Sequence, residues 1–210
     1  MPGSLVFTRT RGPVDLRHIS QWWRWTPGAS WRTPEGPGST LTGREQHPVL
    51  HVAYEDAERY AAWAGSRLPT EAEWELAVRG GLEGAAYTWG DEPEPAGERL
   101  ANFWHGDFPW RSEPGYGTTA PVGSYPPNGH GLFDMAGNVW EWTADWYGGG
   151  ERESLDAAQP EFAVPRKVVK GGSFLCADSY CRRYRPAARR PQMIDTGMSH
   201  VGFRCARLRP

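Results

Sequence analysis

The segment GLFDMAGNVWEWTADWY, residues 131–147, combines a tight turn with an unusual density of tryptophan. Asp134 and Glu141 flank the turn at residues 136–138. A turn of this kind directs backbone carbonyl oxygens inward, and together with two carboxylates these oxygens suit a hard cation such as calcium. The spacing is not that of an EF-hand loop, so a capped turn with solvated acidic side chains is the alternative.

The three tryptophans of this segment, Trp140, Trp142 and Trp146, are expected to be core residues or part of a pocket wall. A chain rich in loops carries many backbone polar groups that need fixed partners. We therefore expect the loops of this protein to be held in place by buried aromatic residues or by metal ions.

Two helices are predicted ahead of this segment. In YEDAERYAAWAG, residues 54–65, apolar residues recur at helical spacing, and Gly65 suits the position after a helix end. LPTEAEWELAVRGG, residues 68–81, carries stronger signals. Thr70 is expected to cap this helix, Glu73 to close a capping box, and two glycines to end it.

The remaining chain predicts little regular structure. Residues 81–127 are dominated by Gly, Pro, Asn, Asp and aromatic residues, whereas RKVVKGGSF (166–174) and HVGFRCARL (200–208) alternate as strands do. Few helices and much irregular chain predict an α+β fold. No low-complexity linker divides the chain, so residues 1–210 are interpreted as a single domain.

Composition limits the classes of function. The chain has 210 residues and a formal net charge of −2, which gives no sign of a nucleic-acid partner or of binding to an anionic membrane. No apolar run approaches a transmembrane helix, and the amino terminus lacks the apolar segment of a secretory signal. Three cysteines are too few for a disulfide scaffold. We expect a monomer in the reducing cytoplasm.

Cys176 and Cys181 stand in GGSFLCADSYCRRYRP, residues 171–186, with four residues between them. Zinc usually takes ligands from two close pairs, and thioredoxin-like redox pairs have two intervening residues, so neither pattern fits well. A structural disulfide would need an oxidising compartment. Two thiolates suit a soft ion such as Cu(I), and the three arginines after Cys181 would favour thiolates if they lie near. Two inert core thiols are the alternative.

Six segments together point to one known family. They are GASWRTPEGPGST (28–40), HPVLHVAYEDAERYAAWAGSRLPTEAEWELAVRGG (47–81), ANFWHGDFP (101–109), GLFDMAGNVWEWTADWY (131–147), KGGSFLCADSYCRRYRPAARR (170–190) and VGFRCA (201–206). These segments resemble the formylglycine-generating enzymes, the sulfatase-modifying oxidases. The helix and tryptophan motifs are shared by a wider superfamily with non-catalytic members, and the cysteines in GGS-x-x-C-x-x-x-x-C are the discriminating part.

The resemblance implies a variant C-type-lectin-like (sulfatase-modifying factor) fold with low regular secondary structure. It also implies oxidation of a cysteine in an unfolded sulfatase polypeptide, within a C-x-P-x-R motif, to Cα-formylglycine, with dioxygen as oxidant and Cu(I) as cofactor. On this interpretation Cys176 and Cys181 hold the copper, and the substrate thiol adds as a third sulfur ligand. Ser173 and Tyr180 would help to orient the oxygen and proton transfers, and Trp140 would form part of the pocket wall.

The resemblance further implies two structural calcium sites. The first falls on Asp134, Gly137, Val139 and Glu141, where Asp134 stands in place of a common Asn and either residue supplies a side-chain oxygen. The oxygen-rich ligand set therefore strengthens the interpretation of residues 131–147 as a calcium-binding segment.

The second calcium site would use Asn102 and the backbone carbonyls of Phe103 and Tyr116. Pro114 stands at the position of its usual acid and offers no side-chain oxygen. This site is therefore expected to be weakened unless Glu113 substitutes.

Other departures from the family pattern bear on redox state and substrate. Ala61, Val78 and Pro186 replace cysteines that form bridges in secreted eukaryotic members, so we expect Cys205 to be a free, buried thiol in a bacterial cytoplasmic protein. His200 replaces an Asn that the resemblance assigns to contact with the substrate peptide, so His200 bears on substrate affinity or sequence preference.

Family members usually begin with a GG-x-F-x-MG segment and an EVT-N helix, neither of which is present here. We therefore expect an amino-terminally incomplete domain with some core surface and peptide groove exposed. A non-catalytic ligand- or peptide-binding module, or an inactive remnant of the superfamily, is the alternative to the oxidase. An iron-dependent sulfoxide synthase would need a His-rich triad from a separate helical domain, which the sequence lacks.

Overall fold

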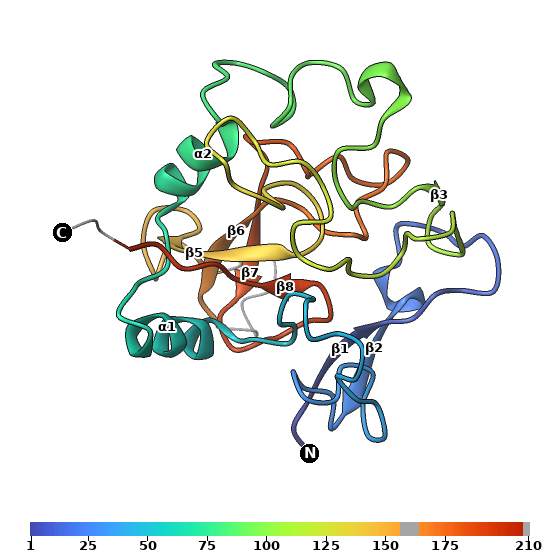
Figure 1. The fold of residues 1–210 in the computed structure, drawn as a ribbon. Helices are drawn as coiled ribbons and strands as arrows, with labels where there is room; N and C mark the ends of the chain where they lie inside the picture. The colour runs from blue at the N-terminus through green and yellow to red at the C-terminus, as the bar shows by residue number, and fades with distance from the viewer. Residues whose placement is uncertain (156–163, 208–210) are drawn as a thin grey trace.

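A computed structural model of the chain describes residues 1–155 and 164–207, with a four-stranded sheet at its centre (Figure 1). The elements are β1 (Gly3–Phe7), η1 (Ile19–Gln21), β2 (Trp23–Pro27), α1 (Tyr54–Trp63), α2 (Glu71–Arg79), η2 (Pro95–Gly97), β3 (Gly106–Asp107), β4 (Arg111–Ser112), β5 (Trp140–Trp146), β6 (Arg166–Lys170), β7 (Arg189–Met193) and β8 (Val201–Gly202). The sheet has the order β7-β6-β5-β8; β6 is antiparallel to both β5 and β7, whereas β8 is parallel to β5.

Strands β1 and β2 form a separate antiparallel hairpin at the amino terminus. The hairpin is attached to the carboxyl-terminal part of the chain, because Ser199 N donates to Leu5 O at 2.9 Å and Phe7 N donates to Ser199 Oγ at 2.9 Å. Two segments almost 200 residues apart therefore lie side by side (Figure 1). This hairpin was not predicted from the sequence.

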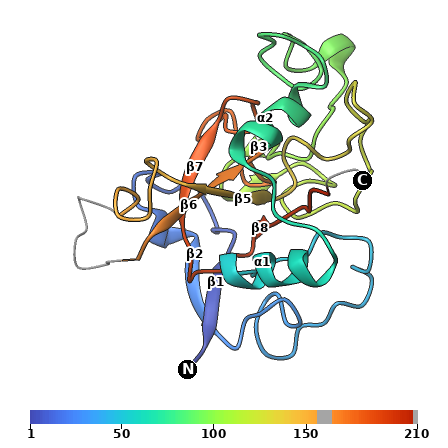
Figure 2. The ribbon, with the colours of Figure 1, turned by 90° about the vertical axis from the view of Figure 1, so that its left-hand side faces the viewer.

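Both predicted helices are confirmed, and both lie on the same side of the sheet (Figures 1 and 2). Thr70 Oγ1 accepts from Glu73 N at 3.2 Å, and Thr70 N donates to Glu73 Oε2 at 2.9 Å, which completes the predicted capping box. Gly80 ends α2 at φ 57°, and Gly65 follows α1 at φ 66°. These left-handed conformations favour glycine, so the sequence signals at both helix ends have a direct structural cause.

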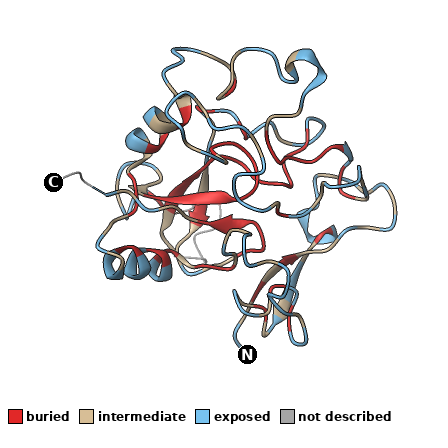
Figure 3. Ribbon diagram, in the orientation of Figure 1, coloured by how far each residue is buried: buried red, intermediate tan, exposed pale blue. Residues whose placement is uncertain are grey.

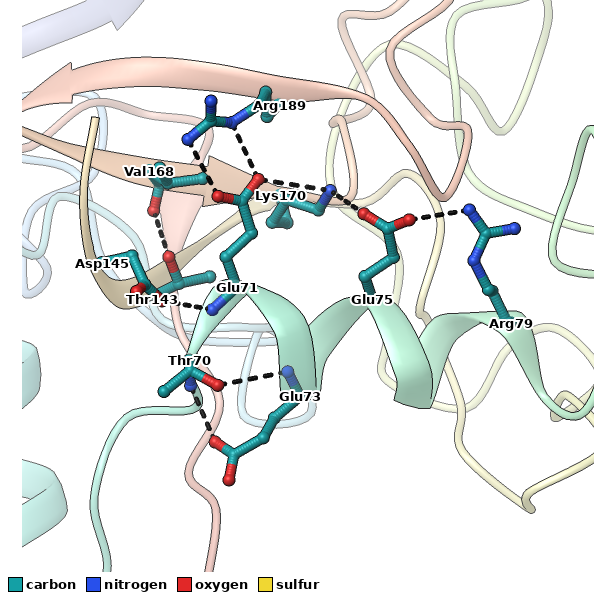
Figure 4. A network of polar contacts seen from close by, with 10 residues as sticks. All are labelled: Thr70, Glu71, Glu73, Glu75, Arg79, Thr143, Asp145, Val168, Lys170 and Arg189. Carbon is teal, nitrogen blue, oxygen red and sulfur yellow. Dashed lines mark hydrogen bonds and ion pairs between the residues drawn. The ribbon is translucent and has the colours of Figure 1, made fainter. Parts of the chain in front are cut away.

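A ladder of ion pairs fixes α2 against β6 and β7 (Figure 4). Lys170 is fully buried, and its Nζ lies 3.1 Å from Glu75 Oε2 and 3.8 Å from Glu71 Oε1. Each carboxylate has a second basic partner: Arg189 Nε lies 2.8 Å from Glu71 and Arg79 NH2 lies 2.7 Å from Glu75. A buried lysine is tolerated here because it is paired with two acids.

The core is built around the tryptophans of β5, at the centre of the buried region in Figure 3. Trp140 and Trp142 are buried, as predicted, and Trp142 Nε1 donates to Val52 O at 2.9 Å. Trp146, at the end of the strand, is only partly buried, and Lys167 Nζ lies 3.6 Å from its ring centroid. The side chain of Trp142 on β5 thus holds the segment before α1 in place, as expected for a fold with few helices.

The irregular segment 81–127 is confirmed, since it contains only the short elements η2, β3 and β4. The predicted strand at 166–174 is confirmed for β6, which ends before Gly171; a Cβ there would lie 3.1 Å from the Trp74 ring. The predicted strand at 200–208 is wrong beyond Val201–Gly202, and its last residue lies outside the described residues. Strands β5 and β7 were not predicted.

No helix within residues 1–155 and 164–207 combines the length and apolar character needed to cross a membrane.

Candidate functional site

The chain leaves β6 and enters a loop that carries both close cysteines. Gly172 adopts φ 73°, and a Cβ there would lie 2.8 Å from Tyr184 N, so the start of the loop requires glycine. Cys181 N then donates to Ala177 O at 2.7 Å, which turns the chain back on itself. As a result, Cys181 Sγ lies 3.0 Å from Cys176 Sγ, within hydrogen-bond distance, and both thiols are free.

The two thiols have unequal surroundings. Cys176 is only 1% exposed, and burial raises its pKa well above the usual range. Cys181 is partly buried, and the hydrogen bond with Cys176, helped by the positive charges of Arg183 and Arg190, lowers its pKa to about 7. Cys181 is therefore the thiol that ionises first near neutral pH.

Aromatic rings enclose the thiol pair. Tyr180 stacks on Phe108 with ring centroids 4.9 Å apart, and Trp22 meets Tyr180 edge-on at 5.6 Å. The rings leave a small cavity of about 50 Å³ against the sulfur atoms, which we call the thiol pocket. Its lining residues are Ile19, Trp22, Trp23, Phe108, Trp140, Ser173, Leu175, Cys176, Tyr180, Cys181, Arg183, Arg190 and His200.

All five residues expected at the catalytic centre line the thiol pocket; they are Trp140, Ser173, Cys176, Tyr180 and Cys181. Trp22, Trp23, Phe108 and Arg190 also line it, and the sequence analysis did not assign them to a site. The run QWWRW, residues 21–25, was the available signal, because adjacent tryptophans before a short strand are unusual on a surface. The amino-terminal hairpin therefore supplies one wall of the pocket.

The polar part of the pocket wall is basic. Arg183, Arg190 and His200 line it, and no Asp or Glu within residues 1–155 and 164–207 does. Of the three arginines expected near the thiols, only Arg183 lies in the wall; Arg182 is directed to Asp178 at 3.6 Å. Burial lowers the pKa of His200 well below its usual value, so this side chain is neutral at pH 7.

Two residues of the first expected calcium site, Asp134 and Glu141, hold the guanidinium group of Arg204. Arg204 Nε lies 2.5 Å from Glu141 Oε2, and Trp74 Nε1 donates to the same carboxylate oxygen at 2.7 Å. Arg204 NH2 also donates to the carbonyl of Asp134 at 3.3 Å. Asp134, Val139 and Glu141 line one pocket, and burial raises the pKa of Asp134. The structure thus brings these oxygens together around a cation of the protein itself.

The second expected calcium site contains an oxygen without a partner. Asn102 is 1% exposed, and its Nδ2 donates to Thr118 O at 2.9 Å and to Asn138 Oδ1 at 3.1 Å. Its Oδ1 has no hydrogen-bond partner in the part of the chain that the structure describes. The two acceptors fix the orientation of the amide. Gly137 lies alongside, and a Cβ on it would be 2.2 Å from Asn102 O, so only glycine fits.

The other residues of this second site are partly engaged. Tyr116 O accepts from Ser112 Oγ at 2.9 Å. Glu113, the expected substitute acid, accepts from Arg99 at 2.6 and 3.0 Å, so its charge is already paired. Phe103, which follows Asn102 in the sequence, is buried. In the described part of the chain, no three His, Cys, Asp or Glu side chains form a metal cluster.

The expectation that Cys205 is buried was wrong. Its side chain is exposed beside a separate surface pocket that Phe203 and Tyr60 also line. The strand predicted over this segment ends at Gly202, which leaves Cys205 on an irregular segment at the surface.

Sequence comparison identifies the family. The model described as "Sulfatase-modifying factor enzyme 1-like domain" matches residues 7–209. The chain belongs to this family. The sulfatase-modifying factor domain thus includes strand β2 of the amino-terminal hairpin, the thiol pocket and the residues of both expected calcium sites.

Curated members of the sulfatase-modifying factor family are similar over most of this chain. It is 52% identical to the formylglycine-generating enzyme of Mycobacterium tuberculosis over 97% of this chain and 72% of the relative. It is 53% identical to that of Thermomonospora curvata over 88% of this chain and 63% of the relative. It is also 41% identical to the "Inactive C-alpha-formylglycine-generating enzyme 2" of Mus musculus, over 96% of this chain and 62% of the relative.

Solved structures share the fold. CarF superimposes with a TM-score of 0.55 and 25% identity over 81% of this chain and 69% of CarF. PvdO from Pseudomonas aeruginosa gives 0.52 and 26% over 75% of this chain and 60% of PvdO. The sulfatase-modifying factor domain therefore has the expected α+β, variant C-type-lectin-like fold with few helices and mixed sheets.

Proposed function

We propose that this protein is an oxidase that converts a cysteine of an unfolded sulfatase polypeptide, within a C-x-P-x-R motif, to Cα-formylglycine, with Cu(I) and dioxygen. One observation carries the proposal: two free thiols lie 3.0 Å apart in a pocket that also holds Ser173 and Tyr180. Family membership and about 50% identity to proteins named formylglycine-generating enzyme support an enzyme that acts on sulfatases.

The donor set of the thiol pocket fits a soft metal ion. Its two sulfur atoms come from Cys176 and Cys181, and the absence of carboxylates from its wall disfavours hard cations such as calcium. We infer that these two sulfurs hold Cu(I), which when bound supplies the redox chemistry that activates dioxygen. The unequal thiols suit this role, since Cys181 is already ionised in part near pH 7.

The surrounding residues would position the substrate and exclude water. The Trp22, Phe108 and Tyr180 rings cover the sulfurs, and Tyr180 is 36% exposed, so part of this side chain is reachable by a peptide. Ser173 is buried, and its Oγ accepts from Leu175 N at 3.3 Å, which places the hydroxyl in the pocket wall for a proton transfer. A substrate thiol entering here would face both protein sulfurs.

The chemistry oxidises the substrate β-carbon. Removal of hydrogen from the carbon and sulfur of the substrate cysteine gives a thioaldehyde, and water then replaces sulfur as sulfide to leave the aldehyde. Dioxygen accepts more electrons on reduction to water than the substrate cysteine provides. A thiol reductant therefore supplies the remaining electrons and belongs in the assay.

The test incubates the protein with copper, a thiol reductant and a synthetic C-x-P-x-R peptide. Mass spectrometry then measures aldehyde formation on the peptide. We expect conversion by the wild type and a loss of more than roughly 100-fold in Cys176→Ser and Cys181→Ser, because a lost metal ligand costs more than a lost outer partner. Cys205→Ser is the matched control and should be fully active, since Cys205 lies at a separate pocket. No conversion by the folded wild type would contradict the proposal.

A non-catalytic binding module is the second candidate, because a relative at 41% identity is named inactive. This alternative predicts peptide binding without conversion, and copper affinity that Cys176→Ser leaves unchanged. Calorimetric titration of Cu(I) into the wild type and into Cys176→Ser, with a competing chelator, separates the two functions without any activity measurement.

We further propose two structural calcium sites. The unpartnered Asn102 Oδ1 is the main support for a site formed with the carbonyls of Phe103 and Tyr116, because a buried oxygen without a donor is costly unless a cation binds it. At the other site, Asp134 and Glu141 face a shared pocket with Gly137 and Val139 close in the chain. Arg204 neutralises the charge of Glu141 there, so Asp134 is the carboxylate that remains to bind calcium.

A further inference from the structure

The thiol pocket contains positive charge that no acidic residue balances. Arg190 lies on β7, where its neighbour Arg189 pairs with Glu71 at 2.8 Å. Arg190 itself and Arg183 have no ion pair or side-chain hydrogen bond among the described residues, and both line the pocket. Burial, and then the nearby charge of Arg183, lower the pKa of Arg190.

A second polar group in the same wall also lacks a partner. His200 is 2% exposed, and its Nδ1 forms no hydrogen bond although the atom is buried. Its ring is fixed against Trp23, with centroids 4.7 Å apart, and cannot turn toward solvent without losing this contact. A neutral imidazole can carry its proton on Nδ1 and donate it.

Unpaired polar groups in an apolar wall are costly. The rest of this wall is formed by rings such as Trp22, Trp23 and Trp140, which shield the charges poorly. Arg190 is partly buried and Arg183 is exposed, and a guanidinium group pairs best with a carboxylate because two parallel hydrogen bonds form. The Cys181 thiolate can offset only one of the two guanidinium charges and cannot form such a paired contact, so the remaining partner is an anion that enters from outside.

We propose that Arg190, together with Arg183 and His200, binds the side-chain carboxylate of an Asp or Glu next to the reacting cysteine of the substrate peptide. This inference rests on the proposed function, because it assumes that a peptide cysteine enters the thiol pocket. The cavity of about 50 Å³ has room for a carboxylate but not for a larger anion such as a phosphorylated side chain. Arg190 is thus a specificity-determining residue, and the arginine of the C-x-P-x-R motif is directed away from this wall by like charge.

The test measures binding and needs neither copper nor turnover. Three amidated peptides carry C-x-P-x-R with Ser in place of Cys and differ only in Glu, Gln or Lys beside the Ser. We expect the wild type to bind the Glu peptide about tenfold or more tightly than the Gln peptide, and the Lys peptide most weakly. Arg190→Gln should abolish this preference, whereas Arg190→Lys should keep part of it.

Arg189→Gln is the matched control, since it removes a neighbouring charge that lies outside the pocket. It should keep the full preference for Glu, and circular dichroism checks that each variant is folded. Competition by sodium acetate at equal ionic strength distinguishes a carboxylate site that any small acid fills from one that needs the peptide. Displacement of the Glu peptide by acetate at a concentration near that of the peptide would overturn the assignment of the ligand to a peptide side chain.

Equal binding of the Glu and Gln peptides, no binding of any peptide to the folded wild type, or an unchanged preference in Arg190→Gln would also overturn the proposal. Failure of the proposed function gives a different result from failure of the carboxylate site. A Glu preference without aldehyde formation leaves the carboxylate site standing and refutes the oxidase, whereas aldehyde formation without a charge preference does the reverse.

Discussion

The two cysteines of the thiol pocket differ because of residues far from them in the chain. Cys176 and Cys181 were recognised as a pair from their spacing, and Ser173 from the motif around them. The charge that separates their ionisation comes partly from Arg190, and the ring that covers them comes from Trp22. Nothing in the sequence around Trp22 or Arg190 indicates that either residue lies beside the thiols, so the sequence could identify the thiols but not their environment.

This difference predicts which thiol reacts in the metal-free protein. The hydrogen bond with Cys176 lowers the pKa of Cys181 to about 7, so its reactive thiolate should form as pH rises through that value. Burial raises the pKa of Cys205, which should therefore react at higher pH. Cys176, at 1% exposure, should react most slowly of the three. Iodoacetamide labelling between pH 5 and 10, resolved by peptide mass spectrometry, measures all three midpoints.

The Cys176→Ser variant serves as the control for this prediction. It replaces the neighbouring thiol by a weaker partner, so the Cys181 midpoint should move up while that of Cys205 stays unchanged. A Cys181 midpoint at or above that of Cys205 in the wild type would show that the pair does not favour a thiolate.

At the scale of elements, α1 and α2 could be predicted because their signals are local. Thr70 and Glu73 are three residues apart, and the caps need no tertiary contact. The strands of the sheet depend on distant partners: Lys170 on β6 meets acids of α2 that lie 95 and more residues earlier. The pattern WEWTADW of β5 has buried residues on both faces, so it lacks the alternation that indicates a strand.

The ladder in Figure 4 predicts that removal of the single buried charge of Lys170 lowers the free energy of unfolding. Replacement of Lys170 by Met removes the cation between Glu71 and Glu75 and leaves two close carboxylates. Both acids are partly exposed and retain Arg189 and Arg79, so we expect a loss of about 2 kcal/mol of unfolding free energy, less than for a fully buried pair. Urea unfolding followed by tryptophan fluorescence measures it.

The matched comparison is Arg59→Met, which removes the same charge from an exposed pair with Glu55 on α1. That variant should unfold at the wild-type urea concentration, because an exposed ion pair contributes little. Equal stability of Lys170→Met and Arg59→Met would mean that the ladder does not hold α2 to the sheet.

At the scale of the whole molecule, the loops between α2 and β5 need something other than regular structure to hold them. Composition indicated this, and the structure shows two of the means: stacked rings such as Phe103 on Tyr184, 4.2 Å apart, and backbone bridges such as Asn102 to Gly137. The sequence could not show that the amino-terminal hairpin closes the thiol pocket, because Ser199 and Leu5 meet only in the folded chain.

The unpartnered oxygen of Asn102 predicts that calcium stabilises these loops. At a calcium concentration about 100-fold above the dissociation constant, binding adds about 2.7 kcal/mol, which raises Tm by roughly 5–10 °C for a domain of this size. Differential scanning calorimetry with calcium or with a chelator measures this shift. Asn102→Ala should lower Tm and remove the part of the calcium response that comes from its own site. Glu141→Gln should lower Tm but keep the response, because Glu141 is held by Arg204 and Trp74. A calcium response of unchanged size in Asn102→Ala would show that Asn102 binds no calcium.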